Sequence, residues 1–248
     1  MTRSGFILTL LVGGSLFAAT PGPTPDPAPD SEGDVVLYRF LDANKSNRIS
    51  GLQMEVDVNA SLPKMQKRGK LQALRTITKL GRITWDRLNF TGDNTIRKEV
   101  IARYIQAEQE SQDTGKFSLT PDHYKFKYKG LETKNGVELH IFQVTPKKKQ
   151  VGYFKGEIWV DPQTYLPVRE AGQLVKNPSM FLKKVQFVRE YEIRDGLAYP
   201  KHVESNVETR FWGPAQMSIE YGNYAKTDEL QSDLTPTPDR IEAQKIEQ

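Results

Sequence analysis

The sequence contains no cysteine, and it has only three histidines among its 248 residues. The absence of cysteine excludes disulfide bonds, thiolate metal sites and a lipid anchor attached to an N-terminal cysteine. The chain also has no HExxH, GxSxG, GxGxxG or P-loop motif, the motifs that carry zinc, hydrolytic and nucleotide chemistry in many enzymes. We therefore expect a protein that holds neither a cofactor nor a metal and is not an enzyme.

Two short segments imitate known sites but lack residues that those sites need. Residues 42–50 have the spacing of a calcium loop, but Asn47 stands where an EF-hand needs glycine, and Gln53 where it needs a bidentate carboxylate. Residues 113–115 spell the Asp-Thr-Gly of aspartic proteases without an apolar strand around them and without a second copy. We interpret the first segment as a helix end followed by a turn, and the second as an exposed loop.

The sequence has one long hydrophobic run, and it lies near the N-terminus. Arg3 precedes an apolar run over residues 6–17, and the small residues Ala18 and Ala19 follow it. This order is typical of a secretory signal peptide, and the run is shorter than the ~20 apolar residues that span a bilayer. We predict a signal peptide over residues 1–19 and an exported protein. An uncleaved N-terminal anchor is the alternative, because bulky residues stand at the cleavage position.

Composition divides the rest of the chain into three parts. Residues 20–33 are rich in proline, which predicts an extended spacer instead of a helix or a central strand. Residues 226–248 are polar and bury little surface, so we expect a mobile tail. Residues 34–225 contain no comparable linker, and they are numerous enough to form one domain with its own core.

Alternation of apolar and polar residues is the main structural signal of this domain. Residues 52–62 are the clearest case, because every second residue from Leu52 to Leu62 is apolar and the residues between are polar or charged. Such alternation predicts an antiparallel strand with one dry and one wet face. Similar or less regular patterns predict strands at 71–80, 83–90, 124–129, 139–145, 153–160, 165–171, 185–193, 201–211 and 215–221. One sheet of about ten strands must curl or close.

Two segments have the pattern of helices. Residues 34–44 begin with an acidic residue and carry apolar residues at mixed spacing. Residues 95–110 place an apolar stripe on one face, with Glu99 and Arg103 spaced for an i,i+4 ion pair. The start of this helix stays open, because residues 91–95 also resemble a hairpin turn. The apolar face of each helix would pack on the inner face of the sheet.

The formal net charge is +4, and the basic residues are clustered. The clusters are Lys64, Lys67, Arg68 and Lys70, then Lys147 to Lys149, then Lys183 and Lys184. Solvated turns and strand ends explain them most simply, and contact with anionic lipid headgroups is the alternative. Nucleic acid is disfavoured as a partner, because the chain is expected to be exported and its aromatic residues form no recognised binding motif.

Four segments in the second half resemble outer-membrane lipoprotein-sorting proteins of the LolA-like superfamily of periplasmic carriers. They are G-E-I-W-V-D at 156–161, L-P-V-R at 166–169, D-G-L-A-Y-P at 195–200 and G-P-A-Q-M-S-I-E-Y-G-N-Y at 213–224. The resemblance implies a mainly β fold, an incomplete and strongly curved antiparallel barrel of about ten strands, with helices as a lid over an apolar cavity. It also implies a periplasmic location and exchange of ligand with membrane-protein donors and acceptors.

The expected ligand is a lipid or the acyl chains of a lipoprotein, bound on the inner face of the sheet without chemical turnover. The candidate lining residues are Met54, Val56, Val100, Tyr104, Phe126, Tyr128, Trp159, Phe187, Tyr191, Val207, Met217, Ile219 and Tyr221. Each of them could instead pack against the helices as core, and the helix near residues 100–105 would gate the cavity. A lipid-sensing regulatory or adaptor protein with the same half-barrel is the alternative. An enzyme would need a convergent polar cluster, and Arg189 and Ser205 are the polar residues that we place on the apolar faces.

Overall fold

The structure is a computed structural model that describes residues 31–47, 49–111, 119–177, 180 and 182–227. The predicted signal peptide, most of the proline-rich spacer, the Asp-Thr-Gly segment and nearly all of the predicted tail lie outside the described residues.

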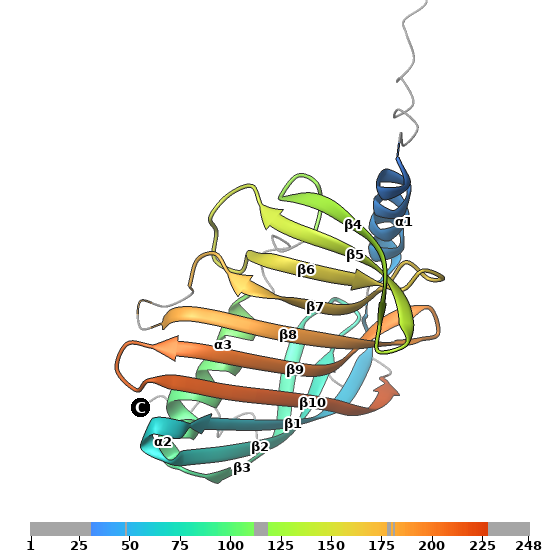
Figure 1. Ribbon diagram of the computed structural model, residues 1–248. Helices are drawn as coiled ribbons and strands as arrows, with labels where there is room; N and C mark the ends of the chain where they lie inside the picture. The colour runs from blue at the N-terminus through green and yellow to red at the C-terminus, as the bar shows by residue number, and fades with distance from the viewer. Residues whose placement is uncertain (1–30, 48, 112–118, 178–179, 181, 228–248) are drawn as a thin grey trace, which may run out of the picture.

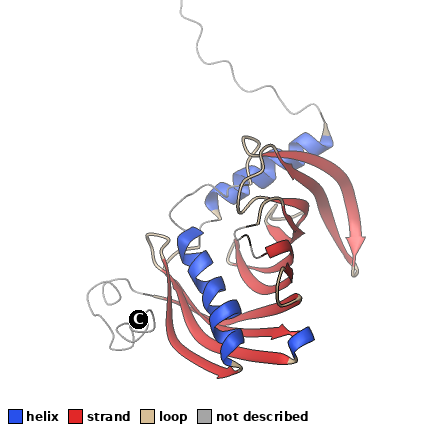
Figure 2. Ribbon diagram, turned by 90° about the vertical axis from the view of Figure 1, so that its left-hand side faces the viewer, coloured by secondary structure: helices blue, strands red, loops and turns tan. Residues whose placement is uncertain are grey.

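The described residues form one curved ten-stranded antiparallel sheet, with helices inside its curve (Figures 1 and 2). The strand order is β3-β2-β1-β10-β9-β8-β7-β6-β5-β4, and the edge strands β3 and β4 do not pair with each other, so the barrel is incomplete. The elements are α1 (Glu32–Ser46), β1 (Leu52–Leu62), η1 (Pro63–Met65), β2 (Lys67–Ile77), β3 (Ile83–Gly92), α2 (Asn94–Ile96), η2 (Arg97–Ile101), α3 (Ala102–Ser111), β4 (Tyr124–Lys134), β5 (Val137–Pro146), β6 (Phe154–Val160), β7 (Pro167–Leu174), β8 (Leu182–Arg194), β9 (Leu197–Thr209) and β10 (Pro214–Lys226). The predicted fold class is confirmed.

The strands follow the alternation of the sequence, and β1 has the predicted limits. Strand β2 differs, because it begins at Lys67 and not at residue 71. The η1 turn, with Gln66 in the left-handed region, closes a tight hairpin in which Leu62 pairs with Lys67. The basic cluster at 67–70 therefore belongs to a strand, although these four residues show no alternation of apolar and polar side chains.

Strands β6 and β7 approach each other closely at two facing glycines, Gly156 and Gly172. A Cβ atom on Gly156 would lie 2.0 Å from the carbonyl oxygen of Ala171, and one on Gly172 would lie 2.5 Å from that of Lys155. No side chain fits at such distances. The pair allows the two strands to approach where the sheet curves.

Helix α1 begins two residues earlier than predicted, because Ser31 caps it by accepting a hydrogen bond from the backbone N–H of Asp34. It buries Val36 and Phe40 against the sheet. The β6–β7 turn also contacts α1, since Arg39 donates a 2.7 Å hydrogen bond to the Tyr165 hydroxyl. The helix ends at Ser46, so the first part of the calcium-like segment is a helix end, as predicted.

The second helical segment runs from Asn94 to Ser111 through α2, the π-helical turn η2 and α3. Asp93 caps it by accepting a 2.7 Å hydrogen bond from the backbone N–H of Thr95, and β3 extends to Gly92. A strand therefore precedes the helix, which decides the alternative left open by the sequence. The predicted ion pair between Glu99 and Arg103 is confirmed at 2.8 Å.

The apolar side chains form two separate cores on the inner face. The α3 core lies under α2, η2 and α3, and its buried members are Leu52, Met54, Val56, Val58, Ala60, Leu62, Leu71, Ala73, Trp85, Ile96, Ile101, Tyr199, Ala215 and Ile219. The α1 core lies under α1, and its buried members are Val36, Phe40, Tyr124, Phe142, Val144, Tyr153, Phe154, Ile158, Val160 and Phe187. The middle of the inner face, on β7, β8 and β9, therefore lies between two helix-covered ends.

Candidate ligand-binding site

The inner face of the sheet holds nearly all of the predicted lining residues. Three of them are completely buried in the α3 core: Met54, Val56 and Ile219. Phe187 is buried in the α1 core. Partly buried residues of the two cores are Val100, Tyr104, Val207, Met217 and Tyr221 on the α3 side, and Phe126 and Tyr128 on the α1 side. The buried members pack as core against the helices, so solvent-accessible lining consists of the partly buried ones.

Trp159 is an exception, because it lies on the outer face of β6. Its neighbours Ile158 and Val160 are fully buried in the α1 core, and alternation along the strand turns Trp159 the other way. There the guanidinium of Arg169 lies 4.3 Å from the centre of the indole ring. The prediction was wrong for this residue, since three consecutive apolar residues do not reveal which two face the core.

The accessible part of the inner face centres on β8, β9 and β10. Val203 and Val207 of β9, with Met217 of β10, are partly exposed members of the α3 core. Ser205 lies between the two valines and pairs across the strands with both Phe187 and Met217. This stretch offers apolar surface that the helices do not cover completely.

A polar contact attaches α3 to the sheet. Arg75 of β2 points inward and forms a 3.0 Å ion pair with Glu108 of α3. Glu108 also accepts a 3.1 Å hydrogen bond from the indole N–H of Trp85. Next to this pair, the hydroxyls of Tyr104 and Tyr221 lie 3.4 Å apart. We call these five residues the α3 clamp.

The α3 clamp is buried, and its electrostatics reflect this. Burial alone would lower the pKa of Arg75, but the charge of Glu108 and its hydrogen bond, together with Tyr221 and Tyr104, raise it overall. Burial raises the pKa of Tyr104 well above its usual value, and that of Tyr221 also rises. The arginine therefore stays charged and the tyrosines stay protonated at neutral pH.

A second polar cluster lies on the floor of the inner face, between the two cores. Arg189 of β8 donates a 3.2 Å hydrogen bond from Nη1 to Oε2 of Glu170 on β7, the residue directly opposite. Tyr191 belongs to the same cluster, since burial, followed by the charge of Glu170, raises its pKa, and the charge of Arg189 lowers it. We call Glu170, Arg189 and Tyr191 the floor cluster.

Arg189 combines two properties that show where it lies. Burial lowers its pKa, and the charge of Glu170 raises it, with a net rise. The Arg189 side chain is 45% exposed, against 8% of the Glu170 side chain. Arg189 is therefore a partly exposed arginine of the inner face that is held by a buried carboxylate.

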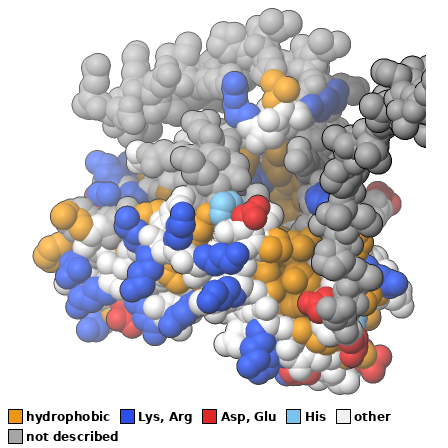
Figure 3. All heavy atoms as spheres, turned by 90° about the horizontal axis from the view of Figure 1, so that it is seen from above, with side chains coloured by type: hydrophobic (Ala, Val, Ile, Leu, Met, Phe, Trp, Pro, Cys, Tyr) orange, Lys and Arg blue, Asp and Glu red, His pale blue; other side chains and the backbone are white. Residues whose placement is uncertain are grey.

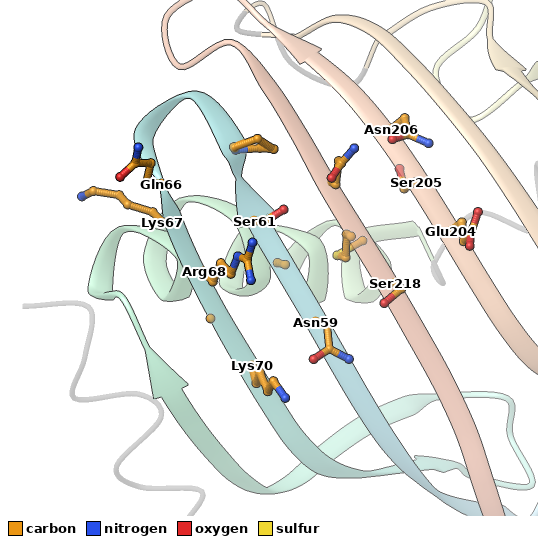
Figure 4. Close-up of a pocket in the computed structure, with 15 residues that line it drawn as sticks. Asn59, Ser61, Gln66, Lys67, Arg68, Lys70, Glu204, Ser205, Asn206 and Ser218 are labelled. Carbon is orange, nitrogen blue, oxygen red and sulfur yellow. The ribbon is translucent and has the colours of Figure 1, made fainter.

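Two hollows lie mainly on the outer face of the sheet. The larger, of about 1000 Å³, lies over β1, β2, β9 and β10, and Figure 4 shows its labelled side chains, among them Asn59, Ser61 and Asn206. The smaller, of about 460 Å³, lies over β6 to β9 and shares Glu204 and Asn206 with the larger one. Most residues that line the larger hollow carry amides, hydroxyls or charges, which suits a hydrocarbon chain poorly, whereas Phe187 and Val188 also line the smaller one.

Three charged residues of the inner face were missed by the sequence reasoning: Arg75, Glu108 and Glu170. Arg75 occupies an inward position in the alternation with Leu71 and Ala73, so its place on the dry face was readable. Glu108 follows Tyr104 by one helical turn, but its partner lies 33 residues away in the sequence. Spacing alone gives no sign of that partnership.

Comparisons with known proteins concern the fold. A family model described only as an uncharacterized protein matches residues 107–210. Among solved structures, a DUF1329 family protein from Desulfovibrio piger matches with 15% identity and a TM-score of 0.46, covering 82% of this chain and 95% of that one. A search of curated proteins finds no match to this chain.

Two other solved structures carry names that agree with the resemblance of the sequence motifs. A putative outer membrane lipoprotein-sorting protein domain from Vibrio parahaemolyticus matches with 12% identity and a TM-score of 0.41, covering 86% of this chain and 98% of that one. A LolA superfamily protein from Nitrosomonas europaea matches with 12% identity and a TM-score of 0.37, covering 82% and 96%. Both likenesses are distant ones, and they concern the fold alone.

In the part of the chain that the structure describes, no helix has the length and apolar character needed to cross a bilayer.

Proposed function

We propose that this protein binds lipid or lipoprotein acyl chains on its inner sheet face and carries them without chemical turnover. The supporting observation is the accessible apolar floor between the helices, where Val203, Val207 and Met217 are partly exposed beside the solvent-reached Arg189. Burying a CH₂ group contributes about 0.8 kcal/mol, so a partly covered apolar floor can hold an acyl chain. An incomplete cover also leaves a route for release.

A dye-displacement experiment tests the binding step. A neutral lipophilic dye should fluoresce on mixing with the protein, and oleate or monoolein should displace it. The Met217→Glu variant should bind the dye about tenfold more weakly or worse, because a carboxylate on the apolar floor disfavours hydrocarbon. The matched control is Gln216→Glu, which adds the same charge on the outer face one residue away.

Two outcomes of this experiment would contradict lipid binding. In one, the wild-type protein does not take up the dye. In the other, the Met217→Glu and Gln216→Glu variants bind it equally. Urea unfolding of both variants shows whether each is folded at the temperature of the assay.

Transfer between vesicles distinguishes a carrier from an adaptor. A carrier located in the periplasm would accelerate the movement of a fluorescent lipid from donor to acceptor vesicles, and membrane proteins would supply and accept the ligand in the cell. A lipid-sensing adaptor would bind the same lipid without accelerating transfer, and it would bind a membrane-protein partner instead. We favour the carrier, because an open floor suits a ligand that must leave again.

Contact with an anionic membrane surface is part of the proposal. Lysines on β4 and in the β5–β6 turn are exposed, and Figure 3 shows Lys and Arg gathered on the face seen from above. These residues are Lys125, Lys127, Lys129, Lys147, Lys148 and Lys149. Lysines on an edge strand also prevent edge-to-edge pairing of sheets, which is a second explanation for them. Measuring the binding of the protein to vesicles distinguishes the two explanations. Vesicles with phosphatidylglycerol should retain the protein at low salt, and replacing the three turn lysines by glutamine should abolish this.

A further inference from the structure

The floor cluster has an unusual setting for an ion pair. It lies between two apolar cores, on a stretch of the inner face where the Arg189 side chain is 45% exposed. An arginine on such a floor is not needed for packing, and apolar residues of similar size would stabilise the fold at least as well. We asked which chemical group this cluster would hold.

The charges of the cluster balance. Arg189 carries a positive charge and Glu170 a negative one, at 3.2 Å. The α3 clamp on the neighbouring part of the face contains a second balanced pair, Arg75 and Glu108. A ligand with a full negative charge would therefore meet no net positive charge at the floor cluster. It would also have to give up part of its hydration to bind there.

The cluster nevertheless offers hydrogen-bond donors. A guanidinium has five N–H groups, and in this structure Glu170 accepts one of them at 3.2 Å. The Arg189 guanidinium lies 4.5 Å from the centre of the Phe187 ring, which holds its plane on the floor. Because nearly half of the Arg189 side chain is exposed, guanidinium N–H groups remain that can donate to a bound ligand.

We infer that Arg189, held by Glu170, binds the uncharged carbonyl of an acyl ester or amide, while the acyl chain lies over the partly exposed apolar residues of β9 and β10. This inference rests on the proposed lipid-binding function and specifies the ligand class. A carbonyl oxygen accepts hydrogen bonds without adding a charge, so it suits a site of zero net charge. Val203, directly opposite Arg189, and Met217 begin the apolar path.

The same two strands supply a matched control on the other face. Arg169 of β7 is paired across the strands with Glu190 of β8, at 3.9 Å on the outer face. This pair has the same residue types on the same strands, with the glutamate and the arginine exchanged. It also has an aromatic ring under its arginine, that of Trp159.

The test compares monoolein, a neutral ester, with oleate, its free acid, at neutral pH. The wild-type protein should bind monoolein more tightly. The Glu170→Gln variant leaves Arg189 with a net positive charge, so the ratio of the two affinities should shift toward oleate by about tenfold, the effect of one charged hydrogen bond. The Glu190→Gln variant should leave the ratio unchanged.

A second variant removes the donors without leaving a buried charge. In the double variant Glu170→Gln with Arg189→Gln, monoolein should bind about tenfold more weakly than to the wild type, and oleate should gain nothing. The corresponding control is Arg169→Gln with Glu190→Gln. The urea midpoint of each variant shows whether it folds. If one variant does not fold, the other inner-face variant and its outer-face control still test the carbonyl site.

The outcomes separate the two proposals. If the wild-type protein displaces dye with neither lipid, the proposed function fails. If lipids bind but the wild type prefers oleate, or if the Glu170→Gln and Glu190→Gln variants have the same affinity ratio, the carbonyl site is wrong and lipid binding stands.

Discussion

Strands β7 and β8 carry two arginine–glutamate pairs, one on each face of the sheet, and the two pairs differ in what surrounds them. On the inner face, Glu170 is 8% exposed and lies 3.2 Å from Arg189. On the outer face, Glu190 is 46% exposed and lies 3.9 Å from Arg169. The two arginines differ in the opposite sense, because Arg189 is 45% exposed and Arg169, over the Trp159 ring, is 26% exposed.

This difference shows how the sheet separates two kinds of polar chemistry. On the outer face water reaches the carboxylate of Glu190, so the ion pair there contributes little to stability. On the inner face, loss of Arg189 would leave the carboxylate of Glu170 poorly solvated, so the free energy of unfolding should fall more. The inner pair can therefore act as a recognition element, whereas the outer pair contributes mainly to solubility.

The largest expected effect comes from a residue that carries no side chain. The Gly156→Val variant should lose roughly 3 kcal/mol of unfolding free energy or fail to fold, because its Cβ would lie 2.0 Å from the Ala171 carbonyl oxygen. Replacing the next residue, the exposed Glu157, by valine should change stability by only about 0.5 kcal/mol. Urea unfolding followed by circular dichroism measures both. Equal losses would show that the two faces do not differ here.

The α3 clamp should produce the next largest effect. The Glu108→Gln variant removes the charge that compensates the buried Arg75, and it should lose about 3 kcal/mol of unfolding free energy. The Glu99→Gln variant breaks an ion pair with the exposed Arg103 on the same helical segment, and it should lose less than about 0.5 kcal/mol. Hydrogen exchange should show α3 opening faster in the Glu108→Gln variant. A similar cost for both would contradict a clamp.

The two facing pairs give the most direct comparison. The Arg189→Met variant leaves Glu170 poorly solvated, and it should lose about 2 kcal/mol of unfolding free energy. The Arg169→Met variant leaves a solvated Glu190, and it should lose less than about 1 kcal/mol. Thermal and urea unfolding at neutral pH provide the numbers. The comparison fails if the outer variant is the less stable one.

The smallest effect concerns the inner face of the edge strand β4. Burial, followed by the charge of Glu32, raises the pKa of Tyr128 to about 12. The pKa is higher in the folded state than in the unfolded chain, so this contribution to stability is complete below pH 10 and is lost as the pH rises toward 12. The Tyr128→Phe variant should therefore lose less stability than the wild type between pH 9 and pH 11.5. Identical losses in urea unfolding would exclude this role.

The fold was largely predictable because the sheet has one dry face. Strict alternation fixed the position of β1, and the β4–β5 hairpin turns at Asn135 and Gly136, both in the left-handed region that an Asn-Gly pair favours. The helix from Asn94 was readable from its apolar stripe and its ion pair. Alternation became ambiguous where the apolar residues were consecutive, and Trp159 was assigned to the wrong face for that reason.

The candidate site was less predictable, because its polar residues meet only through strand pairing. Arg189 was recognised as a polar residue on an apolar face, but its partner Glu170 depends on the register of β7 against β8. The alternation of each strand gives its face and does not give its register. The α3 clamp depends in the same way on how α3 packs over β2 and β3, which no local pattern specifies.

The pairing of β1 with β10 has a consequence for how the molecule assembles. The first strand lies beside the last one, with Leu52 opposite Lys226, so the sheet becomes continuous only when nearly the entire described chain is present. Contacts between such distant residues make folding slow, and they leave the edge of β1 bare while the chain is incomplete. If the chain is exported from its N-terminus onward, as the signal peptide prediction implies, it would need shelter until its final hairpin arrives.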